Sequence, residues 1–429
     1  MAEFKFEIIK TDKNSRARAG VIHTRRGQIE TPHFVPVGTL ASVRSLDAAD
    51  LEMLGAQCAL VNTYHLHLKP GDELIKKLGG THKFMNFTKL LFSDSGGFQA
   101  FSLGLGREHN IGKIGNFFPA EVLLGRDSPK PLRRRRSAEV AQSAEIRSLQ
   151  SLQRLDLCKK ENLTRVSDEG IEFKSIYDGS RHFLDAKRSM EIQSNLDSDI
   201  IMAFDECTSP LSDRDYVAKA MRRTHNWAKL SLEYHNSNQA IYGIIQGGFF
   251  RDLRDESAQF INGLPFDGIA IGGSLGDSKR DMHEILEWVI PQLDARSRHL
   301  LGIGEVDDIF ECVQRGIDTF DCVGPTRVAR RANLYLLPQS GGNRQNKFRI
   351  NISGAKYKDD GNPADANCQC PTCQNYSAAY LHHLYNAREL SYFRLATIHN
   401  LWFMFRLMEK IRESIKADKF REFKREWLG

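Results

Sequence analysis

Short apolar runs recur along this chain, and most of them end in a glycine or a polar residue. Several segments between them, residues 214–234, 279–293 and 306–316, have the apolar spacing of amphipathic helices. Alternation of strands and helices favours a parallel sheet, and eight units in a chain of this length favour a (β/α)8 barrel over an open doubly wound sheet. The predicted strands are Phe34–Val37, Ala59–Asn62, Leu90–Phe92, Ile200–Phe204, Ile241–Ile245, Gly268–Ile271, Leu300–Ile303 and Thr319–Val323.

The segment from about residue 107 to residue 162 breaks this alternation. It contains four consecutive arginines, Arg133–Arg136, followed by residues 137–157, in which apolar residues recur every three positions. That spacing predicts an amphipathic helix, and we interpret the whole segment as an insertion between barrel units. A run of like charges is more often a solvated loop than a phosphate contact, and both interpretations stay open.

Composition narrows the class of protein. The chain has 429 residues, of which 41% are hydrophobic, so it can bury a large core. No apolar run reaches the roughly 18 residues that a membrane helix requires. Charged and apolar residues alternate over the first seven positions, where a secretory signal would need an unbroken apolar stretch. We therefore expect a cytoplasmic protein.

The charge distribution gives a weak indication of a polyanionic partner. The net charge is +6, which alone proves little. Between Arg107 and Lys160, however, the chain has 12 lysines and arginines against 6 aspartates and glutamates. The positive surplus of this stretch therefore equals that of the whole chain.

Three of the eight cysteines lie close together, and a histidine follows them. The cluster is Cys368-Gln-Cys370-Pro-Thr-Cys373, and His399 lies 26 residues further on. Three thiols and one imidazole predict a tetrahedral zinc site, and four protein ligands leave no position for a catalytic water, so the zinc ion would be structural. The other cysteines are scattered, which suits metal binding in a reducing compartment better than a disulfide framework.

The cluster also suggests a division of the chain. Residues 1–347 would form the barrel with an N-terminal β segment, and residues 348–429 would form a zinc-binding subdomain with C-terminal helices. A helix predicted at residues 395–417 would carry the last ligand near its start. His382 and His383 lie near the cluster but outside its spacing, and we interpret them as ordinary helix residues.

Polar residues stand directly after the predicted strands, where a barrel places its functional groups. Asp94, Asp205 and Gln246 follow the third, fourth and fifth strands, and Asp321 lies at the end of the eighth. Three carboxylates at one barrel mouth are unfavourable unless each has a partner or a function. The alternative for any single aspartate is N-capping of the helix that follows.

These four loops have further features of a binding site. Ser93–Gln99 combines an acid with small residues and two glycines, which exposes backbone N–H groups, although such residues also suit a plain turn. An aspartate and a glutamine at neighbouring strand ends match the hydrogen-bonding edge of a purine or pteridine. Three arginines follow Asp321 within ten residues. They indicate phosphate or nucleobase recognition, or else a charged loop with internal ion pairs.

Taken in order, these motifs resemble one family. They are Ser93–Gln99, Phe204–Cys207, Gly243–Gly248, Phe320–Val323, Pro325–Arg327, the cysteine cluster and Thr397–Asn400. The ordered set resembles the tRNA-guanine transglycosylases of the bacterial, queuosine-forming type, from about Lys5 to Phe423 and without the segment 107–162. The resemblance implies a homodimeric zinc-bearing barrel that replaces guanine 34 of tRNAs with G-U-N anticodons by a 7-deazaguanine, which is preQ1 in bacteria.

The resemblance also implies residue roles. Asp321 would be the nucleophile that forms a covalent ribosyl-enzyme intermediate, and Asp94 the acid–base group. Residues implied to contact the base are Ser95, Gly96, Gly97, Phe98, Asp205, Cys207, Gln246, Gly272, Gly273 and Leu301, with Phe98 and Leu301 on the two faces of the ring. Residues implied to contact tRNA are Gly302, Gly304, Thr326, Arg327, Arg330 and Arg331.

The implied chemistry is coherent. Cleavage of a glycosidic bond builds oxocarbenium character at C1′, which a facing carboxylate can stabilise or capture. Two displacements retain the configuration at C1′. Guanine leaves poorly as an anion, so a proton donor is needed, and the same group can then deprotonate the incoming base.

Other interpretations stay open. Queuine could be the incoming base, since the loop Gly272–Asp277 is one residue shorter than is usual in the family. A non-catalytic tRNA-binding subunit need not keep both Asp94 and Asp321, which are present here. A further alternative is an archaeal transglycosylase that modifies a buried tRNA position, although such proteins usually carry long C-terminal extensions. If the resemblance is set aside, the alternative is a barrel hydrolase stabilised by zinc. Residues 107–162 either extend the tRNA contact surface or form a decoration.

Overall fold

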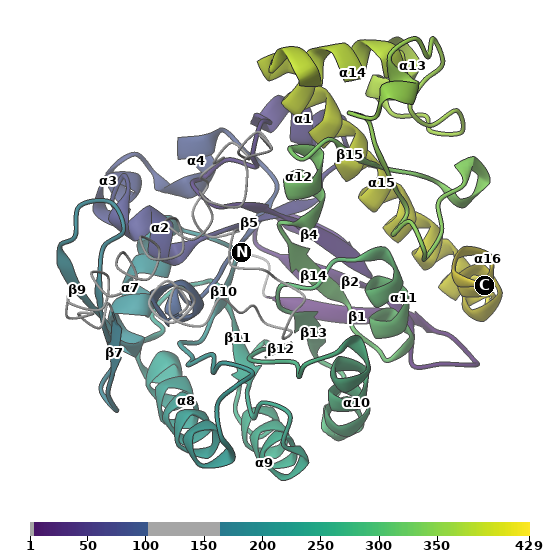
Figure 1. Ribbon diagram of the computed structural model, residues 1–429. Coiled ribbons are helices and arrows are strands. Elements are labelled where there is room, and N and C mark those ends of the chain that lie inside the picture. The colour runs from purple at the N-terminus through teal and green to yellow at the C-terminus, as the bar shows by residue number, and fades with distance from the viewer. Residues whose placement is uncertain (1–3, 102–163) are drawn as a thin grey trace, which may run out of the picture.

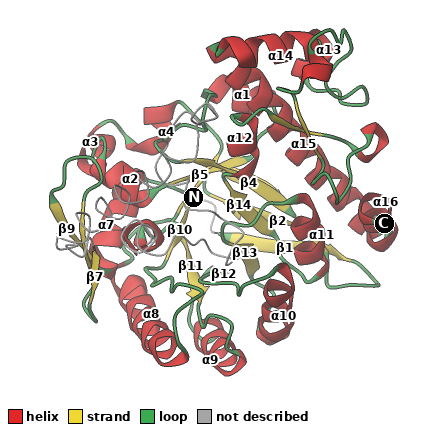
Figure 2. Cartoon of the chain, in the orientation of Figure 1, coloured by secondary structure: helices red, strands yellow, loops and turns green. Residues whose placement is uncertain are grey.

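A closed barrel of eight parallel strands forms the centre of the molecule (Figures 1 and 2). The computed structural model describes residues 4–101 and 164–429. Each barrel strand pairs with its neighbours in chain order, and the last strand pairs with the first. The (β/α)8 prediction is confirmed. The strands are β4 (His33–Gly38), β5 (Cys58–Val61), β6 (Leu90–Ser93), β10 (Ile200–Met202), β11 (Ala240–Ile245), β12 (Gly268–Ile271), β13 (Ser297–Leu300) and β14 (Thr319–Cys322).

Alternate residues of the barrel strands from β4 to β12 face two different apolar layers. On β11, Tyr242 and Ile244 belong to the layer inside the barrel, whereas Ile241 and Ile245 belong to the layer between the barrel and its helices. This is the period of two expected for a strand buried on both faces.

The seventh strand differs from the prediction. It runs from Ser297 to Leu300, three residues before the predicted Leu300–Ile303. Ser297, Arg298 and His299 are all buried, so the strand has polar residues where the apolar pattern was sought. Several of their polar atoms have partners within the fold: Tyr242 contacts Ser297, and Arg298 donates to backbone carbonyls.

Helices cover the outside of the barrel (Figure 1). The predicted helix 214–234 is confirmed without change as α8 (Arg214–Tyr234). The predicted helix 279–293 stops earlier as α10 (Lys279–Val289), because Pro291 opens a 3-10 turn, η3 (Ile290–Gln292). The helix predicted at 306–316 is α11 (Val306–Gln314), which ends before Gly316, whose φ is +99°. The others are α1 (Ala48–Met53), α2 (Thr63–Leu68), α3 (Asp72–Lys77), α4 (Gly80–Met85), α7 (Ala186–Leu196) and α9 (Arg251–Asn262).

A three-stranded antiparallel sheet closes the N-terminal end of the barrel. It consists of β1 (Lys5–Thr11), β2 (Arg18–Thr24) and β3 (Gly27–Thr31). Ile22 and Ile29 pack on the residues that fill the barrel interior, and Arg18 pairs with Asp318 just before β14. The barrel is therefore sealed below, which leaves its C-terminal end, called the mouth here, for ligands. A second small sheet, β7 (Thr164–Val166), β8 (Ile171–Lys174) and β9 (Arg181–Leu184), precedes α7.

The C-terminal helices pack beside the barrel rather than apart from it. The long helix α15 (Leu390–Lys416) runs along β4 and β2 and along the short strand β15 (Figure 1, yellow). It begins five residues before the predicted Leu395. The remaining elements are α12 (Gly324–Ala329), β15 (Asn333–Tyr335), η4 (Pro338–Ser340), β16 (Arg349–Asn351), η5 (Ala355–Tyr357), α13 (Pro371–Asn375), α14 (Ala378–Ala387) and α16 (Phe420–Leu428).

Two predictions about domains are left as predictions. The boundary at residue 348 falls between β15 and β16, which pair with each other. The segment 107–162 and its predicted helix lie outside the described residues. Within the described residues, no helix is both long and apolar enough to cross a membrane.

Candidate active site and metal centre

The predicted polar residues meet around the mouth. Asp94 follows β6, Asp205 lies in the loop after β10, Gln246 follows β11, and Asp321 lies within β14. Gly272 and Leu301 follow the two strands between Gln246 and Asp321. Six consecutive strands of the closed barrel, β6 to β14, therefore each place a predicted residue on the same rim.

Three hydrogen-bond donors hold the carboxylate of Asp94. Thr63 N donates to its Oδ1 at 2.9 Å, Gln99 Nε2 donates to its Oδ2 at 2.9 Å, and Asn62 Nδ2 donates to the same oxygen. Asn62 and Thr63 stand directly after β5, so a seventh strand also contributes to the mouth.

Burial raises the pKa of Asp94 to about 6, from an ordinary value of 3.8. The three donors oppose this rise, and the negative charge of Asp321 adds to it. Burial disfavours the charged carboxylate, and a like charge nearby acts in the same direction. A carboxyl group with this pKa can give and take a proton near neutral pH.

Asp205 and Gln246 form a buried pair beside Asp94. Ser95 Oγ donates to Asp205 Oδ1 at 2.6 Å, and Gln246 Nε2 donates to Asp205 Oδ2 at 2.8 Å. The other amide atom, Gln246 Oε1, is buried and has no hydrogen-bond partner among the described residues. Unpartnered buried polar atoms are uncommon, so a polar ligand with a donor at this point would complete the arrangement.

Two glycines let the main chain approach this pair. A methyl group at Gly97 would overlap the carbonyl oxygen of Asp205, and one at Gly273 would overlap Gln246 Oε1. Gly273 also has φ +77°, which disfavours any side chain. These positions therefore require glycine, Gly97 for space and Gly273 for both space and conformation.

Two groups contact one carboxylate oxygen of Asp321. Gly302 N donates to Asp321 Oδ1 at 2.8 Å, and His299 Nε2 lies 3.2 Å from the same oxygen. The Asp321 side chain is 14% exposed, so it still opens to the mouth. A carboxylate held by hydrogen bonds and partly exposed to the mouth is suited to nucleophilic attack.

The remaining predicted base contacts lie in the loops that follow β6, β10, β12 and β13. Phe98 and Leu301 are half-buried, while Ser95 and Cys207 are buried. A methyl group at Gly272 would come 3.2 Å from Leu301 Cδ1, and one at Gly96 would come 3.3 Å from Thr63 Cγ2.

The predicted arginines lie on or just after α12, next to β14. Arg327 and Arg330 are half-buried, and Arg331 is exposed. Arg330 Nη1 donates to Thr326 O at 2.9 Å. Burial and the neighbouring Arg44, Arg327 and Arg331 lower the pKa of Arg330 to about 10. A group of mutually repelling cations beside the mouth is suited to an anionic partner. Gly304, the last residue implied to contact tRNA, lies against Cys322.

Sequence reasoning missed four residues that shape the site. Asn62 and Thr63 hold Asp94, and His299 contacts Asp321. Arg254, which is fully buried, donates to Gly248 O, Gly272 O and Ser274 O and so ties together the loops after β11 and β12. Burial lowers the pKa of Arg254 to about 9. The available signal was a polar residue at a strand end for Asn62; nothing in the pattern singles out Arg254.

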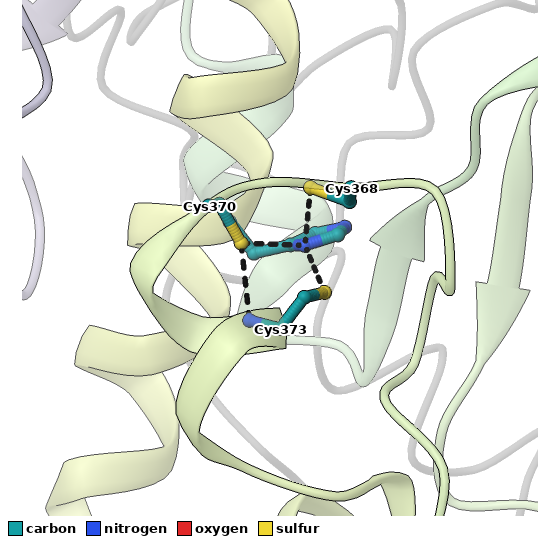
Figure 3. Close-up of side chains that lie close together, drawn as sticks. Cys368, Cys370 and Cys373 are labelled. Atoms are coloured by element: carbon teal, nitrogen blue, oxygen red, sulfur yellow. Dashed lines mark hydrogen bonds between the residues drawn. The ribbon is translucent and has the colours of Figure 1, made fainter.

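The predicted metal ligands form a cluster near the C-terminus (Figure 3). Cys368, Cys370, Cys373 and His399 are all buried, and their ligand atoms lie within 4.8 Å of one another. The distances from His399 Nδ1 to the three sulfur atoms are 3.8, 3.3 and 3.3 Å. A tetrahedral zinc ion with ordinary bond lengths would place sulfur and nitrogen about 3.6 Å apart. The donor set therefore fits a metal ion, with four protein ligands and no fifth group required.

The surroundings of the cluster orient its histidine. His399 Nε2 lies 2.8 Å from Tyr335 O, so Nε2 carries the proton and Nδ1 faces the thiols, as metal-binding histidines usually do. Cys370 Sγ also accepts from Cys373 N at 3.3 Å. His382 instead contacts Ile352 O and Asn386, and neither His382 nor His383 belongs to the cluster, as predicted.

A (β/α)8 barrel with carboxylates at its mouth and a separate buried Cys3His cluster defines the class: a barrel enzyme with a cluster near its C-terminus that could bind a metal ion. A sequence model of the family described as "Queuine tRNA-ribosyltransferase" matches residues 12–119 and 140–429. The chain belongs to the queuine tRNA-ribosyltransferase family, which confirms the resemblance drawn from the ordered motifs.

Individual relatives align over nearly the whole chain. Identity is 53% over 426 residues, 99% of each chain, with a protein of Archaeoglobus fulgidus named "Putative queuine tRNA-ribosyltransferase". It is 41% over 438 residues, again 99% of each, with a Roseiflexus protein named "Queuine tRNA-ribosyltransferase". A Caldanaerobacter subterraneus protein of that name is 39% identical over 432 residues, covering 100% of this chain and 98% of its own. The family match also includes residues 107–119 and 140–162, so the expectation that the resemblance leaves out all of 107–162 is wrong.

Proposed function

We propose that this protein exchanges guanine 34 of tRNAs with G-U-N anticodons for a 7-deazaguanine, preQ1, by double displacement. The main support for this proposal is that Asp94 and Asp321 lie at the same barrel mouth in different surroundings. Asp94 has a pKa near 6, raised in part by Asp321, and Asp321 is bound by a backbone N–H. Two carboxyl groups with distinct environments are suited to distinct acid–base and nucleophilic roles. The names of the relatives support a ribosyl transfer on tRNA.

The base would bind beside the buried pair. Asp205 accepts hydrogen bonds from ring N–H and amino groups, and Gln246 Oε1 accepts the donor that it lacks within the described residues. Ser95 and Cys207 would line the same site, and Gly96, Gly97, Gly272 and Gly273 would let the main chain come close to the bound ring. Phe98 and Leu301, both half-buried, cover its two faces.

In the first displacement, an oxygen of Asp321 attacks C1′ of nucleotide 34. The C1′–O bond forms while the C1′–N9 bond breaks, and the electron pair of the broken bond goes to the guanine. Asp94 in its acid form supplies the proton to the leaving base. With a pKa of about 6, about a tenth of Asp94 is protonated at pH 7.

In the second displacement, Asp94 removes the N9 proton of the incoming base. That nitrogen attacks C1′ and the Asp321 carboxylate leaves with the electron pair of the ester bond. Two inversions give retention, so the product is again a β-nucleoside.

The tRNA would reach the mouth through its anticodon loop, where a single-stranded base can be splayed out. Arg327, Arg330 and Arg331 lie at the rim next to Asp321 and would contact phosphates around the target. Gly302 and Gly304 follow β13, and Thr326 lies on α12 directly after β14, so these three residues belong to the same side of the rim.

Label exchange tests the proposal. The wild-type protein, given a G34 tRNA carrying labelled guanine, should release label when preQ1 is added. Asp321→Asn should lower the exchange rate by roughly 10³-fold or more, and the wild type should form a protein–RNA adduct that survives denaturation. Asp359→Asn, at an exposed position just after η5, is the matched control and should exchange normally. Exchange that survives Asp321→Asn would overturn the mechanism.

The incoming base is tested in the same assay. The proposal is preQ1, with queuine as the alternative for this loop Gly272–Asp277. Equal amounts of each base should be added separately, and the one with the higher kcat/KM for label release is the substrate. Absence of release with both, in the presence of exchange with unlabelled guanine, would reject both assignments.

The metal ion in this proposal is one structural Zn2+. Soft thiolates with one imidazole in a tetrahedral set favour zinc. Its role would be to fix α13 against α15, and no step of the exchange passes through it. Metal analysis of the purified protein should give one zinc per chain.

The assembly and the compartment are also part of the proposal. The family resemblance supports a homodimer, and the reduced state of clustered metal-binding thiols supports the cytoplasm. Light scattering at micromolar concentration should give twice the mass of one chain. A mass equal to that of one chain would reject the dimer.

A further inference from the structure

His299 lies inside the barrel directly beneath Asp321. It is on β13, is fully buried, and stacks on Phe92 with ring centroids 5.5 Å apart. Its Nδ1 lies 2.9 Å from Thr319 Oγ1, and its Nε2 lies 3.2 Å from Asp321 Oδ1. Both ring nitrogens are therefore engaged, one of them by the carboxylate of the proposed nucleophile.

The partners define where the ring proton lies. An ionised carboxylate only accepts hydrogen bonds, so Nε2 must carry a proton to bind Asp321. In the neutral ring Nδ1 is then an acceptor, and the hydroxyl of Thr319 donates to it. Thr319, His299 and Asp321 form a chain in which each group donates to the next. Gly302 N donates to the same oxygen as His299, so two donors converge on Oδ1.

We infer that His299 is a positioning residue for the nucleophile and acts in both displacements. The inference rests on the proposed function, in which Asp321 attacks C1′. Two donors on Oδ1 fix the rotation of the carboxylate and direct its second oxygen toward the mouth. His299 neither gives up nor receives a proton in either step.

The same two donors serve the covalent intermediate. When Oδ2 bonds to C1′, Oδ1 becomes the carbonyl oxygen of the ester and keeps its hydrogen bonds. When the incoming base breaks the C1′–Oδ2 bond, the electron pair returns to the carboxylate. Oδ1 then shares the negative charge, which donors already in place stabilise best.

Two substitutions distinguish the effect of the His299 hydrogen-bond donor from the effect of its aromatic ring. His299→Phe keeps an aromatic ring against Phe92 but removes both nitrogens. It should lower kcat for guanine exchange roughly 10- to 100-fold, which corresponds to the loss of one hydrogen bond to a charged group. The KM for tRNA should stay within about twofold of the wild type. His299→Gln places an N–H near the position of Nε2 and should recover most of the lost kcat.

Thr319→Val tests the chain. It should lower kcat less than His299→Phe, because the ring can keep its Nε2 proton and its hydrogen bond to Asp321. The double variant should be no slower than His299→Phe alone, since both changes interrupt one chain. An additive loss in the double variant would contradict the chain.

Several results would overturn the inference. These are an unchanged kcat in His299→Phe, or equal losses in His299→Phe and His299→Gln. A rise in the KM for tRNA that matches the fall in kcat/KM would assign His299 to binding instead. Thermal unfolding of every variant controls for folding. Failure of the proposed function would look different, because then the wild type itself would show neither label exchange nor the covalent adduct.

Discussion

At the scale of single residues, the ionised carboxyl of Asp94 lowers the free energy of unfolding. Its folded pKa of about 6 lies above the ordinary 3.8, so the folded state binds the proton more tightly than the unfolded state. Stability therefore falls as the pH rises from about 4 to about 6, and the full penalty is present above that window. In the proposed exchange, this ionisable group would serve the acid–base step.

Asp94→Asn should remove this penalty. At pH 7.5 we expect the variant to be more stable than the wild type by on the order of 1–3 kcal/mol, while guanine exchange is lost. Near pH 4 the difference should vanish, because the wild-type carboxyl is then protonated too. Denaturant unfolding of both proteins at the two pH values measures this. A gain that is the same at both pH values would show that the charge of Asp94 is not its cause.

The aspartates of the site were predictable from sequence, whereas their partners were not. Asp94 and Asp205 stand just after apolar strands and Asp321 at the end of one, a position that carries meaning in a barrel. Asn62 falls at the end of a predicted strand but its side-chain direction, which aims it at Asp94, depends on a strand that is distant in sequence. His299 lies in β13, whose first three residues are polar, so the search for apolar runs did not locate this strand. Contacts made across the barrel are absent from any local pattern.

At the scale of elements, two separate constraints require a glycine at position 273, in the loop after β12. Gly273 has φ +77°, and a methyl group there would overlap Gln246 Oε1. Gly179, in the turn between β8 and β9, has the same φ of +77°, but a methyl group there would meet no atom within 4 Å. A side chain would therefore strain the backbone at both positions, but only at Gly273 would it also overlap a neighbouring atom.

Gly273→Ala and Gly179→Ala should separate these effects. Both should lose about 1–2 kcal/mol of stability from the left-handed conformation. Only Gly273→Ala should also displace Gln246 and lower kcat/KM for the incoming base, by roughly tenfold or more. Unfolding curves and steady-state exchange give the two quantities. A loss of exchange in Gly179→Ala of the same size would attribute the effect to strain and not to the base pocket.

The elements themselves were predicted unevenly, for physical reasons. Strands with apolar residues on both faces, such as β11 and β12, were located to within a residue. The prediction of β13 was displaced because this strand itself carries polar residues, Ser297 and His299, which contact Tyr242 and Thr319. The end of α10 was displaced because Pro291 stops the helix while the apolar pattern continues.

The metal cluster joins two helices, which yields a further prediction. Cys370 caps α13 and faces His399 on α15. Cys370→Ser should lower the zinc content well below one per chain and decrease the midpoint of thermal unfolding, because metal binding contributes directly to folding. Cys312→Ser, in a buried position on α11 outside the cluster, should keep its zinc. Full zinc retention in Cys370→Ser would remove Cys370 from the ligand set.

At the scale of the whole molecule, α15 links the C-terminal region to the N-terminal strands of the barrel and of the sheet beneath it. His399 takes part in the metal cluster, and Arg412 donates to Pro32 O just before β4 at 3.0 Å. Asp418, just after the helix, pairs with Lys10 of β1. The C-terminal region is thus fastened to the barrel and to the sheet beneath it. This arrangement could not be derived from hydrophobic patterning, which marked the helix but not the surface that it covers.

His33, at the contact between β4 and α15, makes the whole fold sensitive to acid. It stacks on Phe405, and neither ring nitrogen has a hydrogen-bond partner among the described residues. Burial, with a smaller contribution from Arg412, lowers the pKa of His33 to about 3. The folded state therefore holds the neutral ring. The stability contributed by that preference is fully present above pH 6.5 and is lost as the pH falls below it, because the unfolded state takes up the proton first.

His33→Phe should flatten this dependence. It keeps a ring against Phe405 and cannot be protonated, so its advantage over the wild type should grow by up to about 1.4 kcal/mol per pH unit below pH 6.5, or roughly 2 kcal/mol at pH 5. Both proteins keep the same metal ligands, so the acid sensitivity of the cluster cancels in the difference. His383→Phe, on an exposed part of α14, controls for the removal of a histidine as such. Parallel stability curves for His33→Phe and the wild type between pH 7.5 and pH 5 would show that protonation of His33 does not limit the fold.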